Sequence, residues 1–141
     1  MVTRAGAAVA VLLAAVALAA CQVQPQVVSA RADMEGATVL VSVAVPARDA
    51  AKIKSRELYT YVRVGDCQGM ENGYPAEGYV DGEAISKFSF ATAGPTTTFT
   101  GNVPIRIFEQ YQAPCAALEG GGYFTGTLVS VPLAIKVGPS H

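Results

Sequence analysis

The sequence predicts an all-β protein, a small antiparallel β-sandwich or barrel-like domain of about six strands within residues 37–137. Short segments of this region alternate between apolar β-branched and polar residues with a period of two, which is typical of half-buried strands. Gly and Pro residues separate these segments, and no stretch shows the apolar spacing of a long helix. A small sandwich or barrel satisfies both observations.

The clearest strands are Thr38–Val45 and Glu57–Val64. Valines occupy alternate positions of the first strand, which Pro46 ends. In the second strand one face is mostly apolar, and the other holds Tyr59, Tyr61 and Arg63. The basic residues 48–56 between them are expected to form a short helical turn or an open loop. These charges suit contact with anionic lipid, but a solvated connection with ordinary surface lysines explains them better.

Turn-forming residues dominate the middle of the chain. Residues 65–82 are predicted to form a long acidic loop held in place by Cys67. Phe88 and Phe90 mark a third strand. The best hairpin pattern is Thr96–Thr100, the turn Gly101-Asn102, and Val103–Phe108, because a turn that begins with Gly matches the strand twist.

The C-terminal part is expected to begin with one helical turn over Pro114–Glu119, stopped by the glycines at 120–122. Residues 123–135 alternate in polarity and predict a long last strand with bends or an edge. Residues 138–141 are expected to be a frayed tail.

The N-terminus has the composition of an export signal. Arg4 precedes an uncharged run of about 16 residues, shorter than the roughly 20 that a membrane-spanning helix needs. The run ends in Leu18-Ala19-Ala20-Cys21, which resembles the lipobox of bacterial lipoproteins. This resemblance implies that residues 1–20 are a cleaved signal peptide and that Cys21 becomes the lipid-bearing first residue. An uncleaved membrane helix, or a signal peptide followed by an unmodified cysteine, is the alternative.

Residues 21–36 are predicted to be the lipidated cysteine and a flexible tether. This stretch is rich in Gln and lacks periodicity, and a coil of about 15 residues reaches about 20 Å. Gln22 rather than Asp follows the cysteine. Within the lipoprotein resemblance, this implies the outer membrane, facing the periplasm, if the organism has two membranes.

The chain has three cysteines. If Cys21 carries lipid, Cys67 and Cys115 remain as a pair in an oxidising compartment, which predicts a disulfide. The bond would close a loop of about 49 residues and stabilise the domain by roughly 4 kcal/mol. Two cysteines and His141, the terminal residue, do not make a zinc site, so we expect no metal and no other cofactor.

Charge and motifs argue against two classes of function. The formal net charge of −1 lacks the basic excess of a nucleic-acid-binding protein. No internal histidine and no nucleophile motif is present, so we expect no enzyme. The loop carboxylates Glu71, Glu77 and Asp81 are nominal candidates for a glycosidase pair or for calcium ligands, but solvated surface acids explain them better.

Three tyrosines are candidates for recognition: Tyr74, Tyr79 and Tyr111. They lie in the two segments that the disulfide would draw together, and tyrosine combines a rigid contact surface with a polar tip. The alternative is that they cover the core beneath long loops.

These observations lead to one functional hypothesis. The chain is expected to be a lipid-anchored cell-envelope protein whose β-domain binds a protein or a cell-wall partner without catalysis. A structural subunit of an envelope assembly is the alternative, and a wall-glycan hydrolase is the less favoured one.

Overall fold

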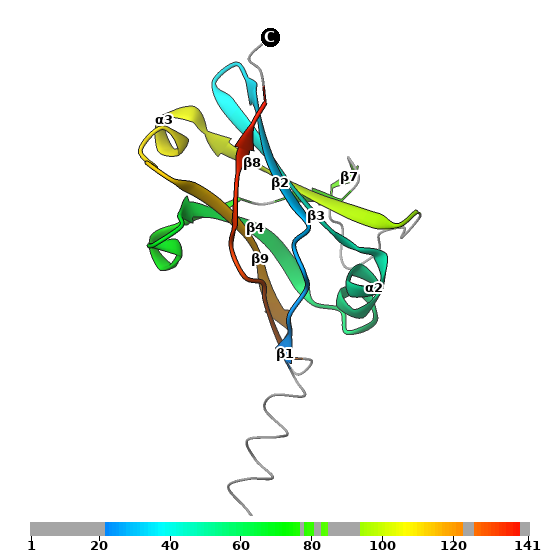
Figure 1. Cartoon of the computed structure of the whole chain (residues 1–141). Helices are drawn as coiled ribbons and strands as arrows, with labels where there is room; N and C mark the ends of the chain where they lie inside the picture. The colour runs from blue at the N-terminus through cyan, green and yellow to red at the C-terminus, as the bar shows by residue number, and fades with distance from the viewer. Residues whose placement is uncertain (1–21, 77, 81–82, 85–93, 123–125, 139–141) are drawn as a thin grey trace, which may run out of the picture.

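The computed structural model describes residues 22–76, 78–80, 83–84, 94–122 and 126–138. Within these ranges the chain forms two mixed β-sheets that pack around one apolar core, which confirms the all-β prediction (Figure 1). The first sheet contains β1 (Gln22–Val23), β10 (Gly126–Val129), β9 (Pro114–Gly122), β4 (Tyr59–Asp66) and β5 (Tyr74–Ala76) in spatial order, with β11 (Leu133–Ala134) also paired to β9. The second sheet contains, in order, β12 (Lys136–Val137), β2 (Ser29–Glu35), β3 (Thr38–Pro46), β8 (Thr96–Pro104), β6 (Gly78–Val80) and β7 (Glu83–Ala84). The described helices are α2 (Ala47–Ser55), α3 (Ile105–Phe108) and the 3-10 turn η1 (Met70–Asn72).

The strands β3 and β4 form as their sequence pattern predicts. All four alternate valines of β3 are fully buried, and so are Val62 and Val64 of β4. The opposite residues of β3 are only partly covered, because successive side chains of a strand point to opposite faces. The alternation therefore identified the face of each strand that packs between the sheets.

The tether predicted for residues 21–36 is wrong from Gln22 onward. Gln22–Val23 pairs in parallel with β10 of the first sheet, and Ser29–Glu35 pairs with β3 of the second. Ala30 and Ala32 of this segment are buried in the core. Small alanines and the charged Arg31, Asp33 and Glu35 hid the alternation of β2, because alanine carries little hydrophobic signal.

The hairpin predicted at Gly101-Asn102 is also wrong. Thr96–Pro104 is one continuous strand that pairs with β3 along its whole length. Gly101 is present for another reason: a Cβ there would lie 2.5 Å from the Cβ of Ala76 in β5. The glycine therefore permits close approach of β5 and β8. A Gly-first turn does occur at Gly36, which joins β2 to β3 with φ +63°.

The helical turn predicted for Pro114–Glu119 is strand β9 instead. This segment has partners on both sides, β4 on one and β10 and β11 on the other. Two ladders of hydrogen bonds outweigh the weak helical preference of one short segment. The predicted long last strand is likewise divided: β10, β11 and β12 are separate pieces in two sheets.

The C-terminal segment is more ordered than predicted. The backbone N–H of Gly138 donates to the Ala32 carbonyl oxygen at 2.8 Å, so the predicted frayed tail does not include Gly138. Residues 139–141, and the strand predicted at Phe88 and Phe90, lie outside the described residues. The loop predicted for 65–82 contains β5, β6 and η1.

The basic segment after β3 is helix α2, which closes one end of the sandwich (Figure 1). Its residues Ala50 and Ile53 are buried against the core. The carboxylate of Asp49 accepts a hydrogen bond from the backbone N–H of Gln26 at 3.0 Å, and thereby ties the helix to the segment between β1 and β2. No helix in the described part of the chain is long and apolar enough to cross a membrane.

Candidate functional site

The predicted disulfide is present and confirmed. Cys67 and Cys115 are bonded, with their Cα atoms 5.0 Å apart. Cys115 lies in β9, and Cys67 lies in the turn directly after β4, where its N–H donates to the Ala113 carbonyl oxygen at 2.9 Å. The Asp66 carboxylate accepts from the Ala113 N–H at 3.1 Å. The cross-link therefore closes one end of the β4–β9 ladder.

The structure brings together two of the three candidate tyrosines. Tyr74 and Tyr111 are partly buried and pack against the core cluster. Burial raises the pKa of Tyr111, against the lowering effect of its hydrogen bond with the Tyr74 backbone. The backbone of Tyr79 instead belongs to β6 and pairs with Thr100 in the second sheet. The three tyrosines therefore do not belong to one loop platform, and Tyr74 and Tyr111 cover the core.

The candidate acids are divided in a similar way. Glu71 lies in η1 and is exposed to solvent. Glu77 and Asp81 lie outside the described residues. Among the described residues, no cluster of three or more His, Cys, Asp or Glu side chains has a geometry that holds a metal ion.

A polar cluster on the outer face of the first sheet was not predicted. Arg63 Nε donates to Glu119 Oε2, Tyr61 donates its hydroxyl hydrogen to the same oxygen at 3.0 Å, and Arg63 also donates to the Gly73 carbonyl oxygen at 2.9 Å. The hydrogen bond to Glu119 raises the pKa of Arg63, while burial opposes it. The strand alternation placed Tyr61 and Arg63 on one face, but assigning Glu119 to a helical turn hid their partner. Because these groups satisfy one another, the cluster fastens β4 to β9.

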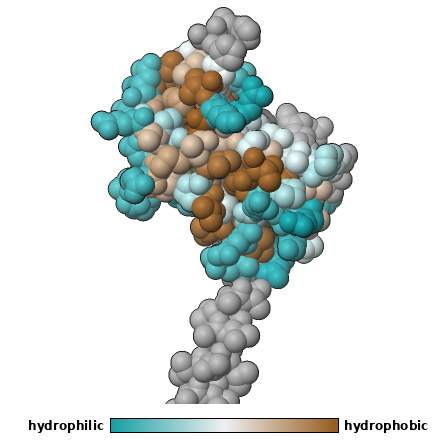
Figure 2. Space-filling model, in the orientation of Figure 1, coloured by the Kyte–Doolittle hydropathy of each residue, from teal (hydrophilic) through white to brown (hydrophobic). Residues whose placement is uncertain are grey.

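The second unpredicted feature is an open groove of about 600 Å³ between residues 28–31 and residues 133–138. It lies beside the C-terminal segment, which leaves the first sheet after β11 and joins the second sheet at β12. The side chains of Val28 and Val137 are about half exposed in it, at 47% and 53%. Figure 2 shows apolar residues gathered on this side of the molecule between hydrophilic margins. A volume of this size falls within the range of ligand-binding clefts.

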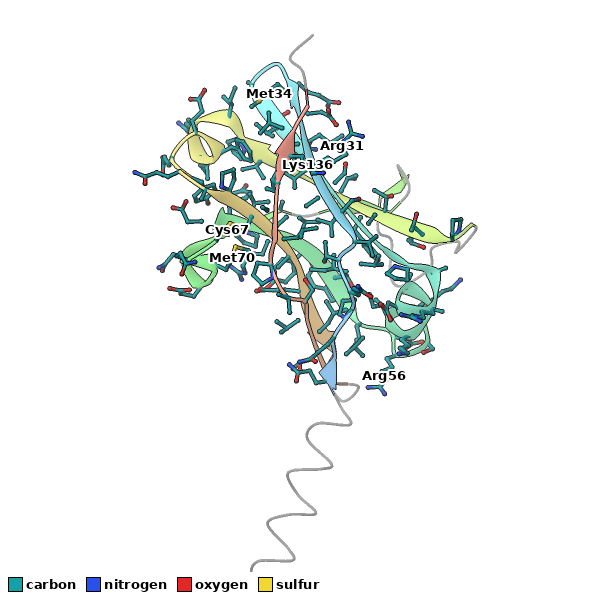
Figure 3. All side chains as sticks on the ribbon, in the orientation of Figure 1. Arg31, Met34, Arg56, Cys67, Met70 and Lys136 are labelled. Atoms are coloured by element: carbon teal, nitrogen blue, oxygen red, sulfur yellow. A yellow bond between two sulfur atoms is a disulfide. The ribbon has the colours of Figure 1, made fainter. Side chains whose placement is uncertain are left out.

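Two cations stand together in the groove. Lys136 and Arg31 are direct neighbours across the parallel β12–β2 pair, and Figure 3 shows them next to each other. Neither forms an ion pair with another residue in the described part of the chain. Like charges on directly paired strand positions repel each other, and Asp33, two residues along the same face of β2 and beside Gly138, offsets part of this repulsion. An anion bound between the two cations would relieve the remainder. Sequence reasoning missed the pair because Arg31 was assigned to the tether and Lys136 to the strand end.

Comparison of the chain with protein-family models, curated proteins and solved structures gave no match.

Proposed function

We propose that this chain is a lipid-anchored protein of the bacterial cell envelope whose β-domain binds an anionic segment of an envelope partner, a protein or a cell-wall polymer, without catalysis. The observation that carries the binding proposal is the Arg31–Lys136 pair in the groove between β2 and the C-terminal segment. Two adjacent cations on the outer face of the second sheet suit a partner that presents a carboxylate or phosphate.

The physical argument concerns charge and water. In the free protein, solvent screens the repulsion between Arg31 and Lys136. A partner that covers the Arg31–Lys136 pair removes part of that water, and the attraction of an anion for both cations then becomes stronger. The two groups bind an anion differently. The planar guanidinium of arginine can donate two parallel hydrogen bonds to a planar anion, and the ammonium of lysine acts as a point charge. The groove therefore favours anionic over neutral partners.

The anchor rests on Leu18-Ala19-Ala20-Cys21 at the end of the apolar leader. The Cys67–Cys115 disulfide supports an exported location, because such bonds persist in oxidising compartments and are rare in the cytosol.

The binding proposal is tested by photo-crosslinking in cells. A photoreactive amino acid at position 137 is expected to give a discrete adduct with an envelope component. That adduct is expected to disappear when Arg31→Gln and Lys136→Gln are combined, and to persist in the control Arg106→Gln, which removes an exposed cation of α3. An adduct that is absent from the parent protein, or unchanged in the double variant, contradicts the proposal.

The anchor and the absence of catalysis have separate tests. Mass spectrometry of the mature protein is expected to show diacylglycerol on the sulfur of Cys21, and Cys21→Ser is expected to give an unlipidated form. An unmodified thiol at the mature N-terminus contradicts the anchor. Reproducible cleavage of peptidoglycan by the purified protein, lost on mutation of Glu71, Glu77 or Asp81, contradicts the non-catalytic assignment.

A further inference from the structure

One end of the first sheet contains the first described residue of the chain. Gln22 pairs with Thr127 of β10, Thr127 pairs with Gly121 of β9, and Gly121 pairs with Tyr59 of β4. These four residues form one row across four neighbouring strands, which we call the anchor rim. Neighbouring strands lie about 4.8 Å apart, so the rim extends about 14 Å from Gln22 to Tyr59. Figure 1 shows β1 at this end of the molecule.

We infer that the anchor rim and the last turn of α2 rest directly on the bilayer that holds the lipid, and that the bilayer surface they contact is anionic. The inference rests on the proposed lipidation of Cys21. The acylated residue would be joined to Gln22 by a single peptide bond, and consecutive Cα atoms are about 3.8 Å apart. Since Gln22 is already paired within the first sheet, no tether separates the folded domain from the membrane.

The side chains of this end suit a membrane interface. Tyr59 is 49% exposed on the outer face of β4. Tyrosine is enriched at the boundary between lipid and water, because its ring is apolar and its hydroxyl stays hydrated. Gln22 and Thr127 are exposed polar neighbours in the same row.

The charges nearby determine which lipid headgroups fit. Residues 48–57 contain four basic and two acidic residues, a net charge of +2. Lys52 and Lys54 are exposed in the last turn of α2, which leads into β4 within four residues. Figure 3 shows Arg56, which follows that turn, toward the end of the molecule at which Figure 1 places β1. Of the two acids, Asp49 is 7% exposed, receives the Gln26 N–H and lies 3.9 Å from Lys52, while Glu57 is exposed. The excess of exposed basic charge favours an anionic surface.

Contact of the anchor rim with the bilayer would orient the proposed binding groove. Figure 3 shows Arg31 and Lys136 displaced from Arg56 toward the opposite end of the molecule, where Met34 lies. A domain seated on the anchor rim therefore presents the groove above the bilayer rather than to it, at a height set by the length of the sheets.

The chain contains no tryptophan, so single substitutions create unambiguous fluorescent probes. The mature lipidated protein is reconstituted into vesicles with brominated acyl chains, and flotation is measured first. Tyr59→Trp and Thr127→Trp report on the rim, and Met34→Trp, 37% exposed at the far end, is the matched control. In vesicles with anionic lipid, both rim probes are expected to show blue-shifted and quenched emission, and the control is expected to show neither. Thr127→Trp keeps the test valid if Tyr59→Trp misfolds.

The charge arm uses Lys52→Gln combined with Lys54→Gln in the Tyr59→Trp background. The combined substitution is expected to shift the equilibrium between membrane-bound and detached domain by at least about fivefold in anionic vesicles and not in zwitterionic ones, with Lys52 contributing less than Lys54 because it lies beside Asp49. Failure of the wild-type protein to float shows that the anchor, and with it the proposed function, is wrong. If the protein floats but the rim probes are quenched no more than the control, the proposed contact of the rim with the bilayer is wrong and the anchor still holds. The same conclusion follows if quenching does not change when both lysines are substituted.

Discussion

The β4–β9 ladder is built in opposite ways at its two ends. At one end the disulfide joins Cys67, directly beyond the last pair of Asp66 with Pro114, to Cys115, which pairs with Gly65. At the other end no covalent link is present among the described residues, and the strands meet where β9 consists of glycine. A Cβ on Gly120 would lie 1.7 Å from the carbonyl oxygen of Tyr59, so this end depends on the absence of a side chain.

The comparison shows two physical routes to the same strand pairing. The disulfide acts mainly on the unfolded chain, whose conformational freedom it reduces, and its removal leaves the folded backbone free to keep its geometry. The glycine end acts through the folded state alone, since any side chain there pushes the two backbones apart. Loss of the disulfide is therefore expected to disturb the folded ladder less than a side chain at Gly120 does. Gly73, which follows η1 at the disulfide end, also has close backbone neighbours, because a Cβ there would lie 2.7 Å from the Val64 carbonyl oxygen.

The largest expected effect is at the glycine end. Gly120→Ala is expected to destabilise the domain by about 4 kcal/mol or more, because its new methyl group meets backbone that cannot rotate away. The matched control is Gly69→Ala at the disulfide end, where nothing lies within 4 Å of the added atom. We expect the control to change the free energy of unfolding by less than about 0.5 kcal/mol in urea denaturation. Equal effects at the two ends would contradict the comparison.

Removal of the disulfide is expected to have the next largest effect. Cys67→Ala combined with Cys115→Ala should lower the free energy of unfolding by up to about 4 kcal/mol, on the loop-entropy estimate. The folded double variant should keep its native far-UV circular dichroism, since β4 and β9 remain paired through eight residue pairs. Alkylation of both thiols in the unreduced exported wild-type protein would argue against the bond.

Between the two ends, the Arg63–Glu119 pair is expected to contribute an intermediate amount. Glu119→Gln should lower the free energy of unfolding by about 1.5 kcal/mol, because Arg63 and Tyr61 then lose a charged hydrogen-bond acceptor. The side chains of the ion pair are mostly buried, with Arg63 19% and Glu119 23% exposed. Lys52→Gln provides the contrast: its side chain is 65% exposed and lies 3.9 Å from Asp49, so its loss should cost less than about 0.5 kcal/mol. Thermal unfolding of both variants checks the difference.

The smallest effect concerns Tyr111 at the disulfide end. Burial raises its pKa above the ordinary value of 10.0, so the folded state retains its proton where the unfolded state begins to lose it. The stabilisation from this shift is fully present below the pKa of Tyr111 in the unfolded state, and it is lost as pH rises through its pKa in the folded state. Stability should therefore decline above pH 10.0. Tyr111→Phe should make this decline shallower. Urea denaturation between neutral pH and the alkaline range measures it, and an unchanged slope would contradict the prediction.

Local pattern predicted the parts of the molecule whose signal lies in a few neighbouring residues. Alternating valines identified β3 and its buried face, and an even pair of cysteines in an export context predicted the disulfide. The Gly101 turn and the Pro114 helix were wrong for one shared reason. A glycine frees the local backbone, and a proline restricts it, in the same way whether the residue serves a turn, an edge or a close contact with a distant strand.

The sequence by itself determined the all-β class, the apolar faces of the two main strands and the disulfide partners. Only the tertiary structure decided that residues 22–35 belong to the sheets, that Glu119 meets Arg63, and that Arg31 lies beside Lys136. Arg31 and Lys136 are more than a hundred positions apart in the chain. Their proximity depends on the C-terminal segment crossing from one sheet to the other, and a local sequence pattern carries no information about strand partners so distant.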